Sequence, residues 1–375
     1  MIFGILRESE DERRVAMLPD EVETLVKAGH SILVENKAGE GSNFTDEKYS
    51  NIGAKLAGKK ELFESAEFIV KINLPTEEEI SFLKSGQYFM SILQPVLNSK
   101  LIQRLTEKKV TLFSLDAIPR ITRGQSMDVL SSQSTVSGYK AVLTAANLYP
   151  RFFPMLTTAA GTIAPAKMLI IGAGVAGLQA IATARRLGAV VEVFDTRPEV
   201  KEQVQSLGAK FVEVEGAADA SKAGGYAVEQ SEEYKKRQKE AIHKSAQKAD
   251  IIITTALIPG RKAPVLITKE MVQDMRAGSV IIDLASVMGG NCELTQDKKT
   301  IVEHGVTIVG NSNLQGTVPI DASKMFGKNI LNFLKNMTNK EGKIQLNLED
   351  EIVSGTCISH NGEIRHAATV EALKK

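Results

Sequence analysis

The sequence has few of the residues that build disulfide frameworks, metal clusters or membrane spans. Its 375 residues include two cysteines, five histidines and no tryptophan. Cys292 and Cys357 are too few for a cross-linked secreted scaffold, and we interpret them as buried thiols. The histidines lack metal-ligand spacing, so we expect no metal site. No uncharged apolar run reaches the ~18 residues that a membrane-spanning helix requires.

The sequence also lacks an excess of charge of either sign. The chain carries 46 Lys and Arg against 45 Asp and Glu, a net charge of +1. This balance gives no general attraction to nucleic acid, and we expect no nucleic-acid partner. The opening MIFGILRESEDERR is charged from Arg7 onward, which excludes a secretory signal and predicts a cytoplasmic protein. The length suits two globular domains.

The most informative segment that is present covers residues 168–195, MLIIGAGVAGLQAIATARRLGAVVEVFD. It consists of a short apolar run, a glycine turn, a helix of small residues and a second apolar run that ends in Asp195. This layout is typical of a dinucleotide-binding βαβ unit. The strand before the glycines and the helix after them supply the context that an isolated glycine motif lacks.

Each glycine of this motif has its own predicted task. Gly172 allows a tight turn after the strand, Gly174 leaves room for a pyrophosphate, and Gly177 lets the helix lie close to the sheet. The pyrophosphate would sit on the helix N-terminus, where Val175 and Ala176 lie, because free N–H groups and the helix dipole favour an anion there.

Asp195 is the predicted ribose ligand. It lies 18 residues after Gly177, at the end of the next strand, where a carboxylate accepts hydrogen bonds from adenosine ribose hydroxyls. Its charge opposes a 2′-phosphate and therefore favours NAD(H) over NADP(H), a preference that Arg197 weakens. Thr196 and Arg197 either hold the adenosine or form an ordinary strand-to-helix turn closed by Pro198.

Short apolar runs alternate with helical runs along the chain, and this alternation predicts an α/β protein with two Rossmann-like parallel-sheet domains separated by a cleft. In the first domain the predicted strands are residues 2–6, 31–35, 67–72, 88–93 and 110–115. In the second domain, strands at 210–215, 250–258, 279–285 and 306–311 extend the sheet that the glycine motif begins.

The tail departs from this alternation. A predicted helix at 321–337 is followed by strands at 344–348 and 352–358, so we expect the chain to return to its first domain. The N-terminal domain is then discontinuous, with residues 1–131 and 321–375. The NAD-binding domain covers residues 132–320, and a helix from Ser132 to Phe153 leads into it.

Three further segments carry a resemblance to a known family. They are PRITRGQSMDVLSSQS (119–134), DTRPEVKEQVQSLGAKF (195–211) and TTALIPGRKAPVLIT (254–268). Together with IIDLASVMGGNCE (282–293), they closely resemble the family of alanine dehydrogenase and the NAD(H)-binding component of proton-translocating transhydrogenase. The resemblance covers nearly the whole chain, and the first two segments resemble the transhydrogenase branch more.

Departures from the alanine dehydrogenase pattern support this branch. Those enzymes bind the substrate carboxylate through the second lysine of a K-x-K-E-P stretch, where this chain has Asn73. Their catalytic histidine follows about twenty residues later, but no histidine lies between His30 and His243. Only Arg14 of that site remains. An amino-acid dehydrogenase needs a general acid or base, whereas hydride transfer between two nicotinamides moves no proton.

The resemblance implies a set of NAD(H)-site residues. Near the nicotinamide, the matched positions are Arg120, Gln125, Asp128 and Ser131, and Ile121, Thr122 and Arg123 of the same loop are also expected to contact the cofactor. Of these, Gln125, Arg120 and Asp128 are the expected catalytic positions. Gly225 and Tyr226 match a loop that closes on the nucleotide. Independently of the resemblance, Leu257 should lie at the carboxyl end of a strand, where ligands bind to open α/β sheets. The residues alone allow other interpretations: a helix cap at Asp128 or Ser131, a plain surface loop, and a core leucine.

The resemblance also implies partners and a location. The chain would bind NADH and pass a hydride to NADP⁺ on a separate NADP(H)-binding subunit, coupled to proton translocation through a membrane-embedded subunit. It would be a homodimer, active only with its partner subunits and peripheral to the inner face of the membrane. Two alternatives stay open: an alanine dehydrogenase-like amino-acid dehydrogenase and a non-enzymatic NAD(H)-responsive module.

Overall fold

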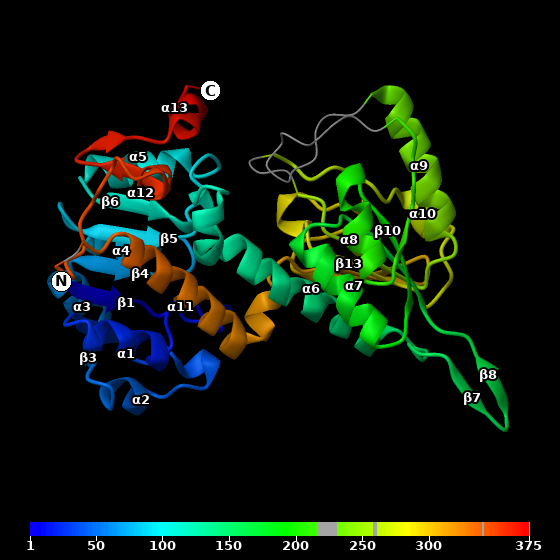
Figure 1. Cartoon of the computed structure of the whole chain (residues 1–375), viewed down its shortest axis with the longest axis horizontal. Coiled ribbons are helices and arrows are strands. Elements are labelled where there is room, and N and C mark those ends of the chain that lie inside the picture. The colour runs from blue at the N-terminus through cyan, green and yellow to red at the C-terminus, as the bar shows by residue number, and fades with distance from the viewer. Residues whose placement is uncertain (217–230, 258–260, 340, 375) are drawn as a thin grey trace. The chain divides into compact units, whose positions relative to one another are not determined.

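The computed structural model describes residues 1–216, 231–257, 261–339 and 341–374. The chain divides into two compact units, which are described separately (Figure 1). The first unit consists of Met1–Gln133 and Gly316–Lys375, and the second consists of Ser134–Gln315. Among the described residues, no helix combines the length and the apolar character needed to cross a membrane.

An eight-stranded mixed sheet forms the centre of the first unit. Its strand order is β17-β16-β6-β5-β4-β1-β2-β3, and the strands from β6 to β3 are parallel. The bounds are β1 Ile2–Ile5, β2 Ser31–Glu35, β3 Lys55–Ala57, β4 Phe68–Val70, β5 Tyr88–Ser91, β6 Thr111–Ser114, β16 Cys357–His360 and β17 Glu363–Ile364. The C-terminal β16 pairs antiparallel with β6, so the tail completes this sheet.

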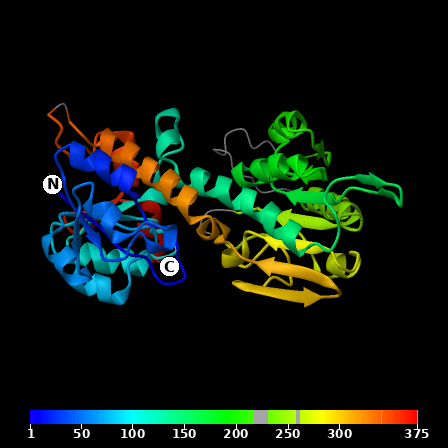
Figure 2. The same ribbon diagram turned by 90° about the horizontal axis from the view of Figure 1, so that it is seen from below.

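Helices cover both faces of this sheet. They are α1 Pro19–Lys27, α2 Asp46–Ser50, α3 Lys59–Ser65, α4 Glu77–Phe82, α5 Ser99–Glu107, α11 Pro319–Asn336, α12 Glu351–Thr356 and α13 Ala367–Leu373. Helix α1 begins at Pro19 and has Asp20 and Glu21 in its first turn, which suits the helix dipole. Helix α11 lies beside α1, although the two are about 300 residues apart in sequence (Figures 1 and 2).

Two predictions for the tail are wrong. Residues 344–348 form no strand, and Ile344 makes only an isolated bridge with Thr338. Residues 352–358 are mostly helical, because the Asp350 carboxylate accepts hydrogen bonds from the backbone N–H groups of Ile352 and Val353 and so caps α12. The strand begins only at Cys357. Apolar content alone did not distinguish the capped helix from a strand.

The second unit has a seven-stranded sheet in the order β11-β10-β9-β12-β13-β15-β14. The bounds are β9 Lys167–Ile171, β10 Val190–Phe194, β11 Lys210–Phe211, β12 Ile251–Thr254, β13 Val280–Asp283, β14 Lys299–Glu303 and β15 Val306–Gly310. All neighbours except β14 and β15 pair in parallel. From β11 to β15 this is the 3-2-1-4-5-6 order of dinucleotide-binding folds, whose topological switch point lies between β9 and β12.

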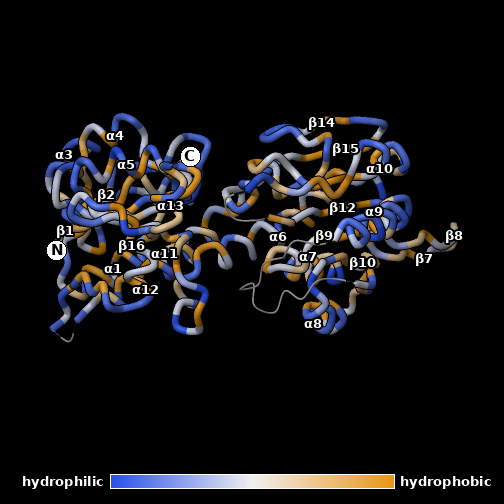
Figure 3. The backbone as a smooth tube through the Cα atoms, turned by 90° about the horizontal axis from the view of Figure 1, so that it is seen from above, coloured by the Kyte–Doolittle hydropathy of each residue, from blue (hydrophilic) through white to orange (hydrophobic). Residues whose placement is uncertain are grey.

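The helices of the second unit are α7 Val175–Arg186, α8 Lys201–Ser206, α9 Glu232–Ala246 and α10 Lys269–Gln273, while α6 Val129–Leu148 begins in the first unit and continues into the second. The core contains β-strand residues such as Ile170, Val193 and Ile253, and apolar positions are orange in Figure 3. The alternation of strands and helices confirms the predicted α/β class.

A two-stranded antiparallel hairpin was not predicted. It joins β7 (Leu156–Thr158) to β8 (Gly161–Ile163) and extends from the sheet of the second unit (Figure 1). Most of its residues are exposed. Its segment is short and contains three threonines in residues 156–163, so it lacks the apolar periodicity by which the other strands were predicted.

Candidate functional site

The glycine turn after β9 has the geometry of a phosphate-binding turn. Gly172 has a φ of 101°, a left-handed conformation that glycine adopts without strain. A Cβ on Gly177 would collide with the carbonyl oxygen of Gly172, so α7 lies directly on the turn. The space that a Cβ on Gly174 would enter is open to 4 Å. The three glycines therefore provide a turn, a close contact and an open approach.

The N-terminus of α7 faces this open approach. Gly174 is the N-cap residue in an extended conformation and supplies no side chain to the helix. Its carbonyl accepts the first helical bond, from Leu178 N–H at 2.8 Å. Val175 is 41% exposed at the first helical position. The N–H groups of the first turn are therefore available to an anion, which the helix dipole also favours.

Asp195 follows β10 and is 8% exposed. Its Oδ2 accepts a hydrogen bond from the backbone N–H of Ala173 in the glycine turn at 2.7 Å. The side chain of Arg197 also binds it, with Nε 2.9 Å from Oδ1 and Nη2 2.8 Å from Oδ2. These hydrogen bonds hold the pKa of the Arg197 guanidinium above its usual value. From the sequence we expected Arg197 to weaken the NAD(H) preference of Asp195 and, with Thr196, either to hold the adenosine or to form a strand-to-helix turn.

A cavity of about 80 Å³ lies beside Asp195 and Thr196, and its other lining residues are Pro198, Lys201, Phe211, Glu213, Val214 and Tyr234. It lies at the carboxyl ends of β10 and β11, the edge where ligands bind to open α/β sheets. Its volume is small, but the ring of Phe211 and the carboxylate of Asp195 combine an apolar surface with a polar one, as an adenosine requires.

The loops after β12 and β13 are held by two buried polar residues that the sequence did not single out. The carboxylate of Asp283 accepts five hydrogen bonds, from Thr254 Oγ1, Thr295 Oγ1 and the N–H groups of Ala285, Asn291 and Cys292. Asn291 in turn exchanges two hydrogen bonds with the backbone of Ala256, at 3.0 and 2.9 Å.

These contacts fix the start of the loop after β12. Thr255 Oγ1 donates to the carbonyl of Gly172 at 3.1 Å, so this loop touches the glycine turn. Leu257 follows and is 43% exposed, which argues against the core interpretation. It lies at the carboxyl end of β12, next to the switch point of the sheet. Two features of the sequence could have identified Asp283 and Asn291. Asp283 ends an apolar strand, and Asn291 directly follows Gly289 and Gly290.

The predicted nicotinamide loop forms a 3₁₀ helix, η3, over Thr122–Met127 in the first unit. The helix is anchored to α11, because the carbonyl of Ser126 accepts hydrogen bonds from Asn329 Nδ2 at 2.8 Å and Asn332 Nδ2 at 2.9 Å. Gln125 lies on η3 with an exposed side chain. The anchored backbone gives Gln125 a defined position while its amide faces solvent.

The other loop residues differ in role. Asp128 accepts hydrogen bonds from the N–H and the hydroxyl of Ser131, at 3.0 and 2.6 Å, and so caps the start of α6. Arg123 pairs with Asp350 at 2.9 Å, which ties the loop to the start of α12. Arg120, Ile121 and Thr122 lie at the surface or partly buried beside the loop. Gly225 and Tyr226 lie outside the described residues.

A second polar cluster is buried in the first unit around Arg14. Its guanidinium binds Glu12 twice, with Nε and Nη2 at 2.8 and 2.6 Å, and Nη1 donates to Gln133 at 2.8 Å. Burial opposes ionisation of Glu12, but the hydrogen bonds from Arg14 hold the pKa of this carboxyl below its usual value. The nearby Lys71 binds Glu79 at 2.7 Å. Each of the two buried cations therefore already has a carboxylate.

Asn73 and Glu8 complete this cluster. Asn73 Nδ2 donates to Glu8 Oε2 at 3.0 Å, and the backbone N–H of Ile72 donates to Glu8 Oε1 at 2.6 Å. Burial raises the pKa of Glu8 to about 7, despite the opposing charge of Lys71. The position where the family's amino-acid dehydrogenases carry a substrate-binding lysine is thus an amide bound to a carboxylate.

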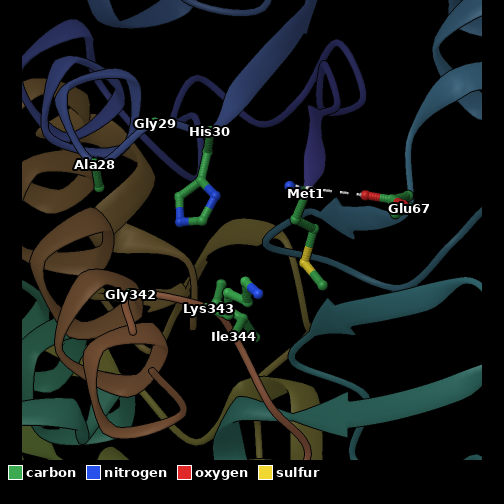
Figure 4. A pocket seen from close by; sticks show the side chains of 8 residues that line it. All are labelled: Met1, Ala28, Gly29, His30, Glu67, Gly342, Lys343 and Ile344. Atoms are coloured by element: carbon green, nitrogen blue, oxygen red, sulfur yellow. Dashed lines mark ion pairs between the residues drawn. The ribbon is translucent and has the colours of Figure 1, made fainter. Parts of the chain in front are cut away.

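A larger hollow of about 410 Å³ lies in the first unit (Figure 4), lined by Met1, Ala28, Gly29, His30, Glu67, Gly342, Lys343 and Ile344. Met1 and Glu67 form an ion pair across it at 4.0 Å. Burial and the N-terminal amine lower the pKa of His30. The hollow lies at the starts of β1, β2 and β4, which is the edge opposite to that where ligands bind in such folds.

Comparison with known proteins identifies the family pattern. The family model described as "Alanine dehydrogenase/PNT, N-terminal domain" matches residues 4–137, and "Alanine dehydrogenase/PNT, C-terminal domain" matches residues 141–367. An NAD(P) transhydrogenase subunit alpha polypeptide of Rhodospirillum rubrum is 48% identical over 366 residues, which cover 95% of each chain.

Two further comparisons separate the branches. The crystal structure of a transhydrogenase from Sinorhizobium meliloti has a TM-score of 0.89 and 43% identity, covering 97% of this chain and 100% of that one. An alanine dehydrogenase of Staphylococcus saprophyticus is 28% identical over 382 residues, covering 100% of this chain and 97% of its own length. The transhydrogenase similarity is therefore the stronger of the two.

Proposed function

The chain belongs to the alanine dehydrogenase/PNT family, and we propose that it is the NAD(H)-binding alpha component of an NAD(P) transhydrogenase. It passes a hydride between NADH on its second unit and NADP⁺ on a partner subunit. The observation that carries this choice within the family is the cluster around Arg14, whose guanidinium is already bound by Glu12. A substrate carboxylate would find no available cation in this cluster.

The second unit supplies the dinucleotide site. The pyrophosphate lies on the N-terminus of α7, where Gly174 leaves it room and the N–H groups of Val175 and Ala176 face it. The adenosine ribose donates to Asp195. Leu257, at the carboxyl end of β12, contacts the nicotinamide half. The loop of Gly225 and Tyr226 covers the bound nucleotide.

The first unit supplies the residues that orient the reacting ring. Gln125 and Arg120 bind polar groups of the nicotinamide half, and Asp128 with Ser131 fixes the loop from which they extend. The hydride moves with its two electrons from NADH to NADP⁺, which yields NAD⁺ and NADPH and transfers no proton to the protein. The protein therefore contributes position rather than acid or base catalysis.

The remaining components come from partners. We assign the NADP(H) site to a separate subunit; within the described part of the chain, the glycine turn of this kind lies in the second unit. A membrane-embedded subunit carries the protons, and the chain sits in the cytoplasm at the inner face of the membrane. We also propose a homodimer, because Phe152, Met155 and Ile163 leave apolar surface exposed beside the β7–β8 hairpin. Equilibrium sedimentation tests this last point.

Mixing experiments test the function. The purified chain should oxidise NADH only when a separate NADP(H)-binding transhydrogenase subunit and NADP⁺ are added. The chain alone should show neither alanine-dependent reduction of NAD⁺ nor oxidation of NADH with pyruvate and ammonia. Robust alanine-dependent activity would overturn the proposal in favour of an amino-acid dehydrogenase. NADH binding without transfer in the mixture would favour a non-enzymatic NAD(H)-responsive module.

A further inference from the structure

All the acceptor positions of Asp195 are in use within the chain itself. Oδ1 accepts from the backbone N–H of Arg197 and from its Nε, both at 2.9 Å. Oδ2 accepts from Ala173 N–H at 2.7 Å and from Arg197 Nη2 at 2.8 Å. A carboxylate offers about four lone-pair directions, so these four hydrogen bonds use each of them once.

Two ribose hydroxyls would raise the number of donors on Asp195 from four to six, one more than the buried carboxylate of Asp283 accepts, so a ribose that binds through both hydroxyls needs some of the present donors to leave. Two of them belong to the backbone, at Ala173 in the glycine turn and at Arg197, and they are held by the fold. The other two belong to the guanidinium of Arg197. Both partners are well buried, with side-chain exposures of 11% for Arg197 and 6% for Asp195. The arginine side chain thus covers the carboxylate that the ribose requires.

We propose that Arg197 competes with the adenosine ribose for Asp195 and must leave this carboxylate when a dinucleotide binds. This inference rests on the proposed NAD(H) site. The planar guanidinium presents two parallel donors to one carboxylate, much as the two hydroxyls of a ribose do. Arg197 is therefore an internal competitor of the nucleotide, and NADH affinity includes the cost of separating this pair.

The displaced arginine also determines the discrimination between NADH and NADPH. Because its backbone lies two residues from Asp195, the released guanidinium stays near the 2′-position of the ribose. It neutralises there the charge that a 2′-phosphate would otherwise bring against the carboxylate. Asp195 alone would reject NADPH strongly, whereas Asp195 with Arg197 rejects it only moderately. Arg197 therefore lowers the affinity for NADH and raises that for NADPH.

The test is calorimetric titration of the full-length chain and of Arg197→Ala. We expect the variant to bind NADH roughly tenfold more tightly, because one partly buried charge pair no longer competes. NADPH should bind roughly tenfold more weakly. The gain should extend to 5′-AMP, which contains the adenosine ribose, and should be absent for nicotinamide mononucleotide. If Arg197 had a purely structural role, its removal would not change the affinity for 5′-AMP while leaving that for nicotinamide mononucleotide unchanged.

Two further variants control the experiment. Arg186→Ala removes the same charge from an exposed position in the last turn of α7, and all affinities should stay within about twofold of wild type. Arg197→Lys keeps the cation but cannot present two parallel donors, so it should gain affinity for NADH and retain that for NADPH. It keeps the proposal testable if Arg197→Ala does not fold.

The outcomes distinguish a failure of the proposed dinucleotide site from a failure of the proposed displacement of Arg197. If the wild-type chain binds neither NADH nor 5′-AMP, the proposed dinucleotide site is wrong. If wild type binds NADH but both Arg197 variants bind it equally well or more weakly, Arg197 is a ligand of the nucleotide or a bystander, and the displacement is wrong. Equal changes in the affinities for 5′-AMP and nicotinamide mononucleotide would likewise contradict it.

Discussion

A Cβ atom on Gly177 would collide with the carbonyl oxygen of Gly172, five residues earlier in the chain. The first turn of α7 therefore rests on the turn that ends β9, and a side chain at this position would force the helix away from the sheet. Gly174, between them, borders open space instead. In this motif Gly177 is therefore required by packing, whereas Gly174 matters only for a ligand that binds at the turn.

Substitution of these two glycines should separate folding from binding. Gly177→Ala should lower the free energy of unfolding by about 2 to 3 kcal/mol, because the new methyl group overpacks a backbone contact. Gly174→Ala should change it by less than about 0.5 kcal/mol and still weaken NADH binding roughly 100-fold, since the methyl group meets the pyrophosphate. Urea unfolding and calorimetry measure the two effects. Unchanged NADH affinity in Gly174→Ala would contradict the assigned phosphate position.

Substitution of the exposed loop residues should affect transfer more than binding. Gln125→Asn shortens the side chain by one methylene and withdraws its amide from the ring, and Arg120→Ala removes a cation. Each should slow hydride transfer to NADP⁺ on the partner by roughly 100-fold, because small misplacement of a reacting group is costly. NADH affinity should change by less than about fivefold. Stopped-flow transfer rates are the measurement, and unchanged rates in both variants would make this loop structural.

The anchor of that loop gives an independent test. Asn329 donates to the carbonyl of Ser126 and accepts from Ser132 Oγ at 2.7 Å, so it holds both η3 and the start of α6. Asn329→Ala should slow transfer roughly tenfold or more without touching the nucleotide. Asn332→Ala removes a single, more exposed anchor and serves as the matched control, with less than about a threefold effect. A wild-type transfer rate in Asn329→Ala would show that the anchor does not position Gln125.

The buried Glu8 should make stability depend on pH. Its folded-state pKa is raised by burial to about 7, above the usual 4.5, so the native state holds a proton that the unfolded chain releases. Stability should therefore fall as pH rises from about 5 to about 7 and level off above. Glu8→Gln lacks this loss, so its stability relative to wild type should increase by on the order of 2 kcal/mol between pH 5 and pH 8. Urea unfolding at the two pH values measures this difference, and parallel profiles would show that Glu8 does not titrate in this range.

The local elements of the site were predictable from the sequence. Gly172, Gly177 and Asp195 lie within one βαβ unit, where chain connectivity fixes their relative positions once the strands and helix form. Order and spacing therefore sufficed for the motif. The central strands were equally predictable, because buried parallel strands give uninterrupted apolar runs such as residues 251–254.

The elements that depend on distant contacts were not predictable. Arg14 meets Gln133, 119 residues away, and the anchors of η3 come from α11, about 200 residues further along the chain. Neither of these two contacts produces a periodic pattern in the sequence. The pair of Asp195 and Arg197 is local, but the same two residues fit a nucleotide contact and a self-contained ion pair equally well. The structure shows the ion pair, and the nucleotide contact of both residues stays a prediction.

Reinstalling the family's substrate lysine should not restore an amino-acid dehydrogenase. Asn73 Nδ2 lies 3.0 Å from Glu8 Oε2 and 3.4 Å from Glu12 Oε2, so the ammonium of Asn73→Lys would be bound by carboxylates before any substrate arrived. Arg14 would remain paired with Glu12. We therefore expect no oxidation of NADH with pyruvate and ammonia above the wild-type background.

The same variant should have a measurable effect on stability, which shows that the lysine has entered the cluster. A cation beside Glu8 favours its ionised form and lowers its pKa, so the loss of stability between pH 5 and pH 8 should shrink compared with wild type. Asn73→Gln, which adds length without charge, should keep the wild-type pH profile. A flattened profile together with absent dehydrogenase activity would show that the carboxylates hold the lysine. Pyruvate-dependent activity in Asn73→Lys would instead mean that this cluster still admits a substrate.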